Sequence, residues 1–380
     1  MVAPRKVLIL GSGTAGITLA NKLRLLNKPS ELDIEVIGKE TKHFCKADST
    51  MISLGFKDYK NSVKSVDFLL NNDITFTRET VESVHPYSRV VVTESGKQHS
   101  YDVLVIATGA VLHEELIPGF SDESKHFYDL QHSIELYKNL EDFTEGKVVI
   151  GVPELPVQCP IANHEFALML HELLKERGVR EKCEIHFVYP EDLLFPDGNI
   201  SDMFKSKFDE SGIICHTGFK LKDIIQKNKE IVSESGEKIN YNLLVLAPPH
   251  RGQDFLLKSG LCDDKGFVKV DKETLAVEGH EDVYAIGDAS NLPIPKTASA
   301  IVHSVKYLSR RITAQVKSLN FFGKYDGSVS CSIAVGMNNG ITLSFSYTEK
   351  PRVPLESRAD FNYKSYFSDT YFSTFLRGLM

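Results

Sequence analysis

The sequence predicts an α/β protein with two tandem Rossmann-like, three-layer domains, the second inserted in the first, and a C-terminal membrane-docking or interface region. A strand, glycine turn, helix and strand at the N terminus and a partial internal repeat of this pattern support the prediction. The 380 residues, 42% hydrophobic and 25% charged, suffice for two or three ordered domains. The expected domains are 1-112 with 253-318, then 113-252, and finally 319-380.

The first unit, "KVLILGSGTAGITLANKLRLLNKPSELDIEVIG", reads as strand, turn, helix and strand. Its turn has the GxGxxG spacing, which lets the backbone turn tightly and bring a pyrophosphate to the positive end of the helix. A dinucleotide is therefore expected to contact Gly11, Gly13, Thr14, Ala15 and Gly16.

Two further contacts to this dinucleotide are expected from the same domain. The strand in "YDVLVIATGA" ends in a turn formed by Ala107, Thr108 and Gly109. The acid that usually binds the ribose is displaced from its normal place after the second strand, so Glu40 is only a candidate for that role.

The repeat indicates that the second domain has lost its nucleotide site. "KVLIL" begins at Lys6 and "KVVIG" begins at Lys147, but the turn after the second strand carries Pro153 and Pro156 instead of glycines. A second pair of prolines at 248-249 replaces the ATG turn. Proline supplies no N–H and fills the space that a pyrophosphate needs, so this domain is not expected to bind NAD(P)H.

The segment "VYAIGDASNLPIPKTAS" favours FAD over NAD in the first domain. Gly287 and Asp288 end a short strand, where a carboxylate can accept hydrogen bonds from ribityl hydroxyls. Lys296 and Thr297 precede the next helix, and the lysine is expected near the flavin, where a cation stabilises the anionic reduced ring. The alternatives are an aspartate that only caps a helix and a solvated loop lysine.

Charge and composition exclude several classes of protein. The formal charge of -7 and the pI near 6.0 argue against a nucleic-acid partner. The six cysteines form no CxxC pair, so no metal site is expected. The chain enters a strand at once, without a signal peptide, which favours a cytoplasmic location, and no window is apolar enough to span a membrane.

Four segments carry a family resemblance: "PVQCP" followed by "EFA", "APPHRGQDFLLKSGLCDDKGFVKVD", "VYAIGDASNLPIPKT" and "SVSCSIAVGMNNGITLSF". With them the chain resembles sulfide:quinone oxidoreductases and the flavoprotein subunit of flavocytochrome c sulfide dehydrogenase, over nearly its whole length. The resemblance implies oxidation of sulfide to sulfane sulfur or polysulfide, with FAD as cofactor and a membrane quinone as acceptor. It also implies a redox pair beside the flavin, Cys159 and Cys331.

Other functions remain open on the sequence alone. They are a type II NADH:quinone dehydrogenase, another FAD-dependent thiol/disulfide oxidoreductase, and a sulfur-carrier flavoprotein without catalysis.

The candidate catalytic residues differ in how much the local sequence says about them. Pro160 favours the first helical position, so Cys159 is expected at the helix N-cap, where a thiolate has a lowered pKa. Cys331 lies in a strand pattern typical of a core cysteine, and only the resemblance makes it a redox residue. Glu165 has two readings: it accepts a proton near the thiol, or its negative charge only stabilises the N terminus of the helix. His132 also has two: it relays a proton, or it is a surface histidine without a catalytic role.

Cys45 has three readings: covalent attachment to the flavin methyl group, a redox thiol, or a bystander. Many quinone-linked relatives carry a further cysteine where this chain has Tyr128, which puts the length of the sulfur chain in doubt.

The last segment, "RADFNYKSYFSDTYFSTFLRGLM", interleaves aromatic residues with Lys364 and Arg377. This pattern favours peripheral attachment to a lipid bilayer surface, on the cytoplasmic face of the cell membrane. The alternative is a tail packed on its own domain or on a second subunit. We also expect a homo-oligomer.

Overall fold

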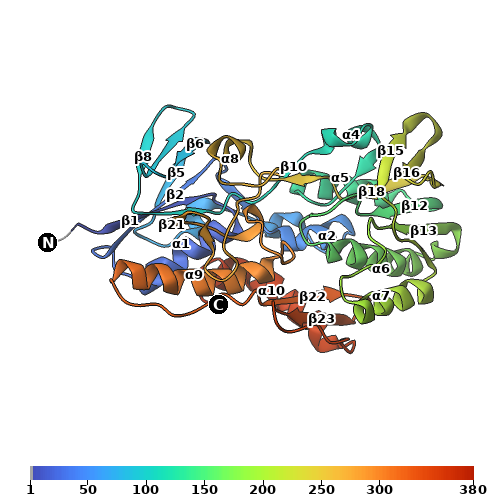
Figure 1. Cartoon of the computed structure of the whole chain (residues 1–380). Helices are drawn as coiled ribbons and strands as arrows, with labels where there is room; N and C mark the ends of the chain where they lie inside the picture. Colours follow the sequence, from blue (N-terminus) through green and yellow to red (C-terminus); the bar gives the residue numbers. More distant parts are fainter. Residues whose placement is uncertain (1–2) are drawn as a thin grey trace.

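A computed structural model of the protein describes residues 3–380. The first nucleotide-binding domain is built on a six-stranded sheet (Figure 1). The strand order is β20-β21-β9-β1-β2-β5, and every neighbouring pair except β20 and β21 is parallel. Strands β1 and β9 are almost entirely Val, Ile and Leu, because a central parallel strand is buried on both faces. The strands are β1 (Arg5–Leu10), β2 (Leu32–Gly38), β5 (Thr75–Arg78), β9 (Val103–Ile106), β20 (Ala276–Val277) and β21 (His280–Ala285).

Helices cover one face of this sheet and a small antiparallel sheet covers the other. Helices α1 (Thr14–Leu26) and α9 (Ala298–Val316) pack against each other and share a core with β1, β2 and β9. The opposite face packs on β6 (Val81–His85), β7 (Val90–Thr93), β8 (Gln98–Ser100) and α8 (Asp254–Ser259). The expected βαβ start is therefore confirmed.

The segment between β2 and β5 leads along one side of the central cavity. It contains β3 (Lys42–Phe44), α2 (Ser49–Ser53), β4 (Val63–Ser65) and α3 (Val66–Leu69).

The second domain repeats this architecture. Its sheet has the order β11-β18-β12-β13-β14, all parallel, and β15-β16-β17 form a second antiparallel sheet. The strands are β11 (Ser124–Lys125), β12 (Gly146–Gly151), β13 (Cys183–Val188), β14 (Ile213–His216), β15 (Leu221–Ile225), β16 (Glu230–Ser233), β17 (Lys238–Asn240) and β18 (Leu243–Leu246). The helices are α4 (Phe120–Glu123), α5 (Leu130–Glu141), α6 (Ile161–Glu176) and α7 (Gly198–Glu210).

The chain crosses between the two domains through one pair of short strands. Strand β10 (Val111–Leu112) leads into the second domain, and β19 (His250–Arg251) leads out, paired antiparallel to β10. These crossings lie beside the domain boundaries predicted at 112/113 and 252/253.

The C-terminal region lies below the junction of the two domains (Figure 1). It consists of the hairpin β22 (Val329–Ala334) and β23 (Gly340–Phe345), helix α10 (Arg358–Thr370) and a π-helical turn, η7 (Tyr371–Phe375). Strand β22 contacts α6, α9 and α10, so it touches both domains.

Apolar residues among the last ten pack on the first domain, as the alternative prediction for the tail expected, and attachment of α10 to a membrane stays a prediction. Tyr371, Phe375 and Leu376 are fully buried in the core around α1. The Tyr371 hydroxyl lies 2.7 Å from Thr14 Oγ1, and Asn21 Nδ2 donates to Leu376 O at 2.6 Å. Within residues 3–380, the structure contains no helix with the length and hydropathy of a membrane span.

Candidate active site

The glycine turn of the first domain is shaped by close backbone contacts. Gly11 has a φ of +112°, and a Cβ there would lie 2.4 Å from Ala107 O. A Cβ on Gly16 would lie 1.9 Å from Gly11 O. Only glycine fits both places, so β1, α1 and the turn after β9 meet closely, as a dinucleotide turn requires.

The later dinucleotide motif meets this turn in space. Gly287, with a φ of +65°, follows β21, and a Cβ there would lie 3.1 Å from the Ala15 side chain. Strand β21 pairs with β9, so the turn with Thr108 and Gly109 and the Asp288 turn lie at neighbouring strand ends. Three segments remote in the sequence therefore converge at the carboxyl edge of one sheet.

A cavity of about 680 Å³ extends from these motifs into the junction of the domains. All three regions of the chain contribute to its walls. Polar residues that line it include Thr14, Lys46, Tyr128, Gln158, Cys159, Glu165, Asp288, Lys296, Thr297, Cys331 and Lys364.

A hydrogen-bonded chain fixes the wall between the dinucleotide motif and the cysteine turn. Gln158 donates to Asp288 Oδ2 at 2.5 Å and accepts from Lys46 Nζ at 2.9 Å. Cys159 N donates to Lys296 O at 2.9 Å. Neither Lys46 nor Gln158 could be predicted as a site residue, because their hydrogen-bond partners come from other segments.

Lys296 lines the cavity, and its ammonium group is turned toward the backbone. It donates to Asp288 O at 2.9 Å and Ser290 O at 2.8 Å and lies 3.8 Å from the centroid of the Phe267 ring. Burial lowers the pKa of Lys296 to about 8.

The two cysteines Cys159 and Cys331 meet in the cavity wall. Both are free thiols, and their side chains lie close enough to interact. The interaction with Cys159 and the positive charge of Lys364 lower the pKa of Cys331, whereas the interaction with Cys331 and burial raise the pKa of Cys159. A thiolate is therefore favoured on Cys331 rather than on Cys159.

The N-cap prediction for Cys159 is wrong. Helix α6 starts at Ile161 with Pro160 as its preceding residue, and Cys159 has a φ of +42°. The bond from Cys159 N to Lys296 O holds the residue in this left-handed conformation outside the helix. The interaction with Cys331 and burial raise the pKa of Cys159, so the more acidic thiol is Cys331.

A buried ion pair lies beside the thiols. Lys364 Nζ lies 2.6 Å from Glu165 Oε1, and Ala334 N also donates to this oxygen at 2.6 Å. Burial alone would lower the pKa of Lys364, but the carboxylate and the two thiols raise it. Its positive charge in turn lowers the pKa of Cys331. Sequence reasoning placed Lys364 in a membrane tail and so missed it.

The exposed Glu40 lies beside the glycine turn, where Ser12 Oγ donates to its backbone oxygen at 3.4 Å, and its role toward the ribose stays a prediction. Two other predicted site residues do not line the cavity. Cys45 is fully buried in the core of the first domain and is absent from the described lining of the cavity, and burial raises its pKa. His132, in α5, contacts Asp129 and Glu114 rather than the thiols.

Comparisons with known proteins agree with this architecture. The family model described as pyridine nucleotide-disulphide oxidoreductase matches residues 5–304. The chain is 28% identical over 357 residues to a mouse mitochondrial sulfide:quinone oxidoreductase, covering 91% of this chain and 79% of that protein. It is 22% identical over 368 residues to a Staphylococcus saprophyticus type II NADH:quinone oxidoreductase, covering 90% of each.

A solved structure has the same fold over nearly the whole chain. The sulfide:quinone oxidoreductase of Aquifex aeolicus superposes with a TM-score of 0.89 at 23% identity, covering 98% of this chain and 92% of that one.

Proposed function

The chain belongs to the pyridine nucleotide-disulphide oxidoreductase family, and we propose that it is an FAD-dependent sulfide:quinone oxidoreductase. The observation that carries this proposal is the contact between Cys159 and Cys331 in a cavity that also reaches the dinucleotide motifs. The sulfide:quinone oxidoreductases among the relatives support the choice of substrate and acceptor.

The residues at the sheet edge fit FAD. A Cβ on Gly13 would meet no atom within 4 Å, so space lies open at the N terminus of α1, where a pyrophosphate binds. Asp288 would hold the ribityl hydroxyls, and the cavity continues from there to the thiols. When bound there, FAD would supply two-electron redox chemistry between the sulfur site and the quinone.

The two cysteines supply the sulfur chemistry. In the oxidised enzyme they form a disulfide, and hydrosulfide attacks Cys159, because the more acidic Cys331 is the better leaving group. The disulfide bond breaks, leaving a persulfide on Cys159 and a thiolate on Cys331. When these two groups are oxidised together, two electrons and one proton leave, and the added sulfur remains between the cysteines. A second hydrosulfide releases this sulfur as hydropolysulfide and restores the disulfide.

Lys364 and Glu165 prepare the leaving thiolate. The ammonium group of Lys364 stabilises negative charge on Cys331, and Glu165 holds the ammonium group in place. Glu165 is buried and Lys364 is half-buried between α6, β22 and α10, where water screens charges less than it does at an open surface.

The turn of the second domain supports sulfide rather than NADH as the reductant. Residues 152–160 contain Pro153 and Pro156, with Val152 and Val157 buried. Glu154, ion-paired with Arg251, adds a carboxylate that would repel a pyrophosphate.

Anaerobic titration of the holoenzyme tests this proposal. We expect sulfide to bleach the flavin absorption within a catalytic turnover and decylubiquinone to restore it, whereas NADH leaves the flavin oxidised. The sulfide-treated flavin alone, without protein, is the control. Rapid bleaching by NADH would favour the type II NADH:quinone dehydrogenase instead.

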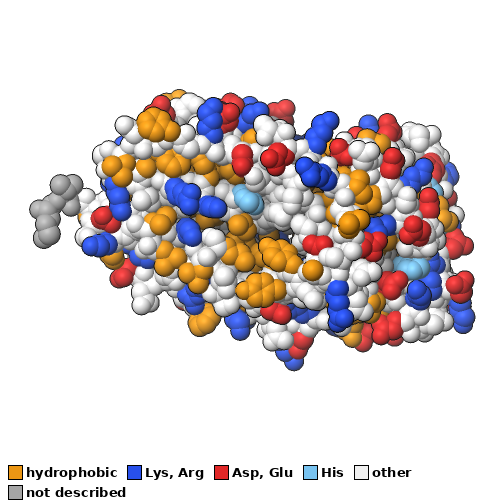
Figure 2. All heavy atoms as spheres, turned by 90° about the horizontal axis from the view of Figure 1, so that it is seen from below, with side chains coloured by type: hydrophobic (Ala, Val, Ile, Leu, Met, Phe, Trp, Pro, Cys, Tyr) orange, Lys and Arg blue, Asp and Glu red, His pale blue; other side chains and the backbone are white. Residues whose placement is uncertain are grey.

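We further propose that the face carrying α10 docks on a lipid surface. Figure 2 views the molecule from this side, where hydrophobic side chains gather over the middle of the surface. Tyr363 and Tyr366 of α10 are 51% and 57% exposed. Tyr363 also lines the cavity beside Phe56 and Phe361, which gives a quinone an apolar entrance from the membrane.

Sedimentation with liposomes tests the docking. The double variant Tyr363→Glu and Tyr366→Glu should lose roughly tenfold or more in lipid affinity, because both carboxylates would have to enter the interface. Tyr87→Glu is the matched control, since Tyr87 is 93% exposed in the turn between β6 and β7. Equal binding by the double variant and the control would contradict the docking face.

A further inference from the structure

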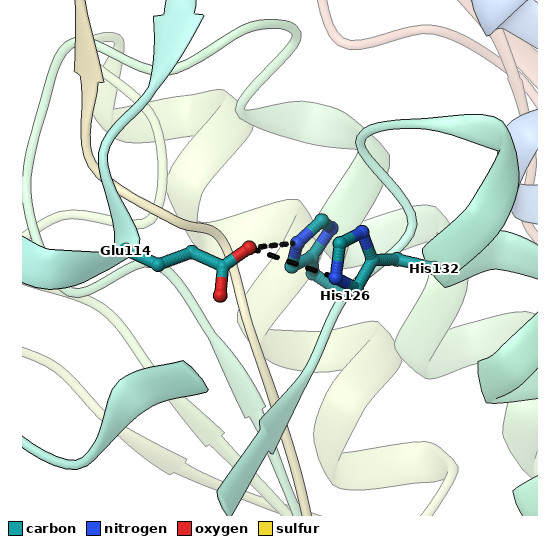
Figure 3. Close-up of side chains that lie close together, drawn as sticks. All are labelled: Glu114, His126 and His132. Carbon is teal, nitrogen blue, oxygen red and sulfur yellow. Dashed lines mark hydrogen bonds and ion pairs between the residues drawn. The ribbon is translucent and has the colours of Figure 1, made fainter. Parts of the chain in front are cut away.

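A second group of polar side chains, Glu114, His126 and His132, lies close together beside the connection between the domains (Figure 3). Glu114 follows β10, His126 follows β11 and His132 lies in the first turn of α5. Glu114 Oε1 is 3.0 Å from His126 Nε2 and 3.6 Å from His132 Nε2. One ligand atom of each residue lies within 4.8 Å of the other two. Figure 3 shows both imidazole rings turned toward the same carboxylate.

These distances suit a common metal ion. Zinc binds imidazole nitrogen and carboxylate oxygen at about 2.0–2.2 Å, so ligand atoms around one ion are separated by roughly 3–3.6 Å. The two carboxylate-to-imidazole distances already fall in this range. The two imidazole nitrogens lie within 4.8 Å of each other, and movement of the half-exposed side chains of Glu114 and His132 would bring all three ligand atoms around one ion.

The protonation states also suit ligation. The hydrogen bond from His126 holds the pKa of Glu114 at about 2, so this carboxylate is ionised at neutral pH. Burial lowers the pKa of His126, which leaves its imidazole neutral. His132 Nδ1 lies 2.7 Å from Asp129 Oδ2, and such a carboxylate fixes the tautomer that directs the Nε2 lone pair toward a metal.

One contact opposes binding and must open. Tyr128 N donates to His126 Nδ1 at 3.2 Å, which places the imidazole proton on Nε2. A metal on Nε2 moves that proton to Nδ1 and displaces the Tyr128 amide. Because Tyr128 also lines the cavity of the thiols, the ion would shift a residue of the active site.

We propose that Glu114, His126 and His132 form a binding site for a divalent first-row transition metal, with Zn²⁺ as the best-matched ion. Glu114 belongs to the connection from the first domain, and both histidines belong to the second. The bound ion therefore ties the connection to the second domain. The cysteine pattern could not indicate this site, because no cysteine takes part in it.

Zinc titration of the sulfide-free protein tests the site by calorimetry, with thermal unfolding measured in parallel. Glu114→Gln keeps the size of the side chain and removes its charge, and His132→Asn changes a half-exposed ligand. Both variants avoid the buried His126. The matched control is His216→Asn, because His216 Nε2 lies 2.9 Å from His186 Nδ1 in a second histidine pair that could bind zinc adventitiously.

We expect saturable zinc binding and a raised Tm in the wild type and in His216→Asn. Zinc binding should weaken at least about tenfold in Glu114→Gln and in His132→Asn, because the first substitution removes a charged ligand and the second removes an imidazole ligand. Cobalt in place of zinc should give the intense visible absorption of a four-coordinate ion only in proteins that retain both Glu114 and His132, which are the wild type and His216→Asn. Absence of saturable binding, equal binding in the ligand variants, or loss of binding in His216→Asn would overturn the proposal.

Discussion

Replacing either Cys159 or Cys331 with alanine is expected to slow sulfide-driven flavin reduction by about a thousandfold or more. The two residues act as one catalytic unit, so the loss of either one removes most of the rate that both provide together. Without one sulfur the disulfide that hydrosulfide attacks cannot form. FAD content should stay near that of the wild type, since the glycine turn and Asp288 belong to other segments. Anaerobic stopped-flow absorption measures the rate, and the flavin spectrum measures the cofactor.

Cys262→Ala is the matched control for these variants. Cys262 is a half-buried free thiol that packs against the core of the first domain and is not among the described residues lining the cavity, so the rate should not change. Full sulfide-driven reduction in either Cys159→Ala or Cys331→Ala would remove the proposed redox pair.

Replacing Lys364 with methionine is expected to move the pH dependence of flavin reduction to higher pH. Lys364 lowers the pKa of Cys331, so its loss raises that pKa and leaves less thiolate at a given pH. An opposite charge at this range shifts a pKa by about one to two units, so the alkaline shift should be of that order. The rate at neutral pH should fall by about tenfold for each unit, because the thiolate fraction falls in that proportion.

The same variant should also lose stability. The Glu165 carboxylate is 2% exposed and would remain without its cation, which costs about 3–5 kcal/mol when one partner of a buried pair is removed. Urea unfolding measures this loss. Lys364→Arg keeps the charge and should restore the pH profile in part, and Lys350→Met on the exposed surface should change neither property. A wild-type pH profile in Lys364→Met would exclude a role for its charge.

The local rules of the chain predicted the dinucleotide motifs well. The spacing of Gly11, Gly13 and Gly16 and the strand before Gly287 describe turns whose geometry depends on a few neighbouring residues. Such turns can be predicted because the contacts that require glycine lie within one βα unit or between adjacent strand ends.

Local rules failed where a distant contact decided the conformation. Pro160 made Cys159 a natural N-cap, but the bond from Cys159 N to Lys296 O pulls it out of the helix. The aromatic pattern of the tail is typical of a membrane-surface segment. In the structure, however, Tyr371 and Phe375 are buried in the protein core against α1. An apolar pattern in the sequence predicts that the side chains will be covered, but it does not identify what covers them.

By itself the sequence determined the α/β class and the strand-turn-helix unit around the glycine turn, because periodicity and turn chemistry act over a few residues. Only the tertiary structure decided which thiol is more acidic, since the charge that acts on Cys331 comes from Lys364. It also decided that Glu114, His126 and His132 converge. A pKa or a ligand set depends on distances through space, and the sequence does not contain these distances until the domains pack together.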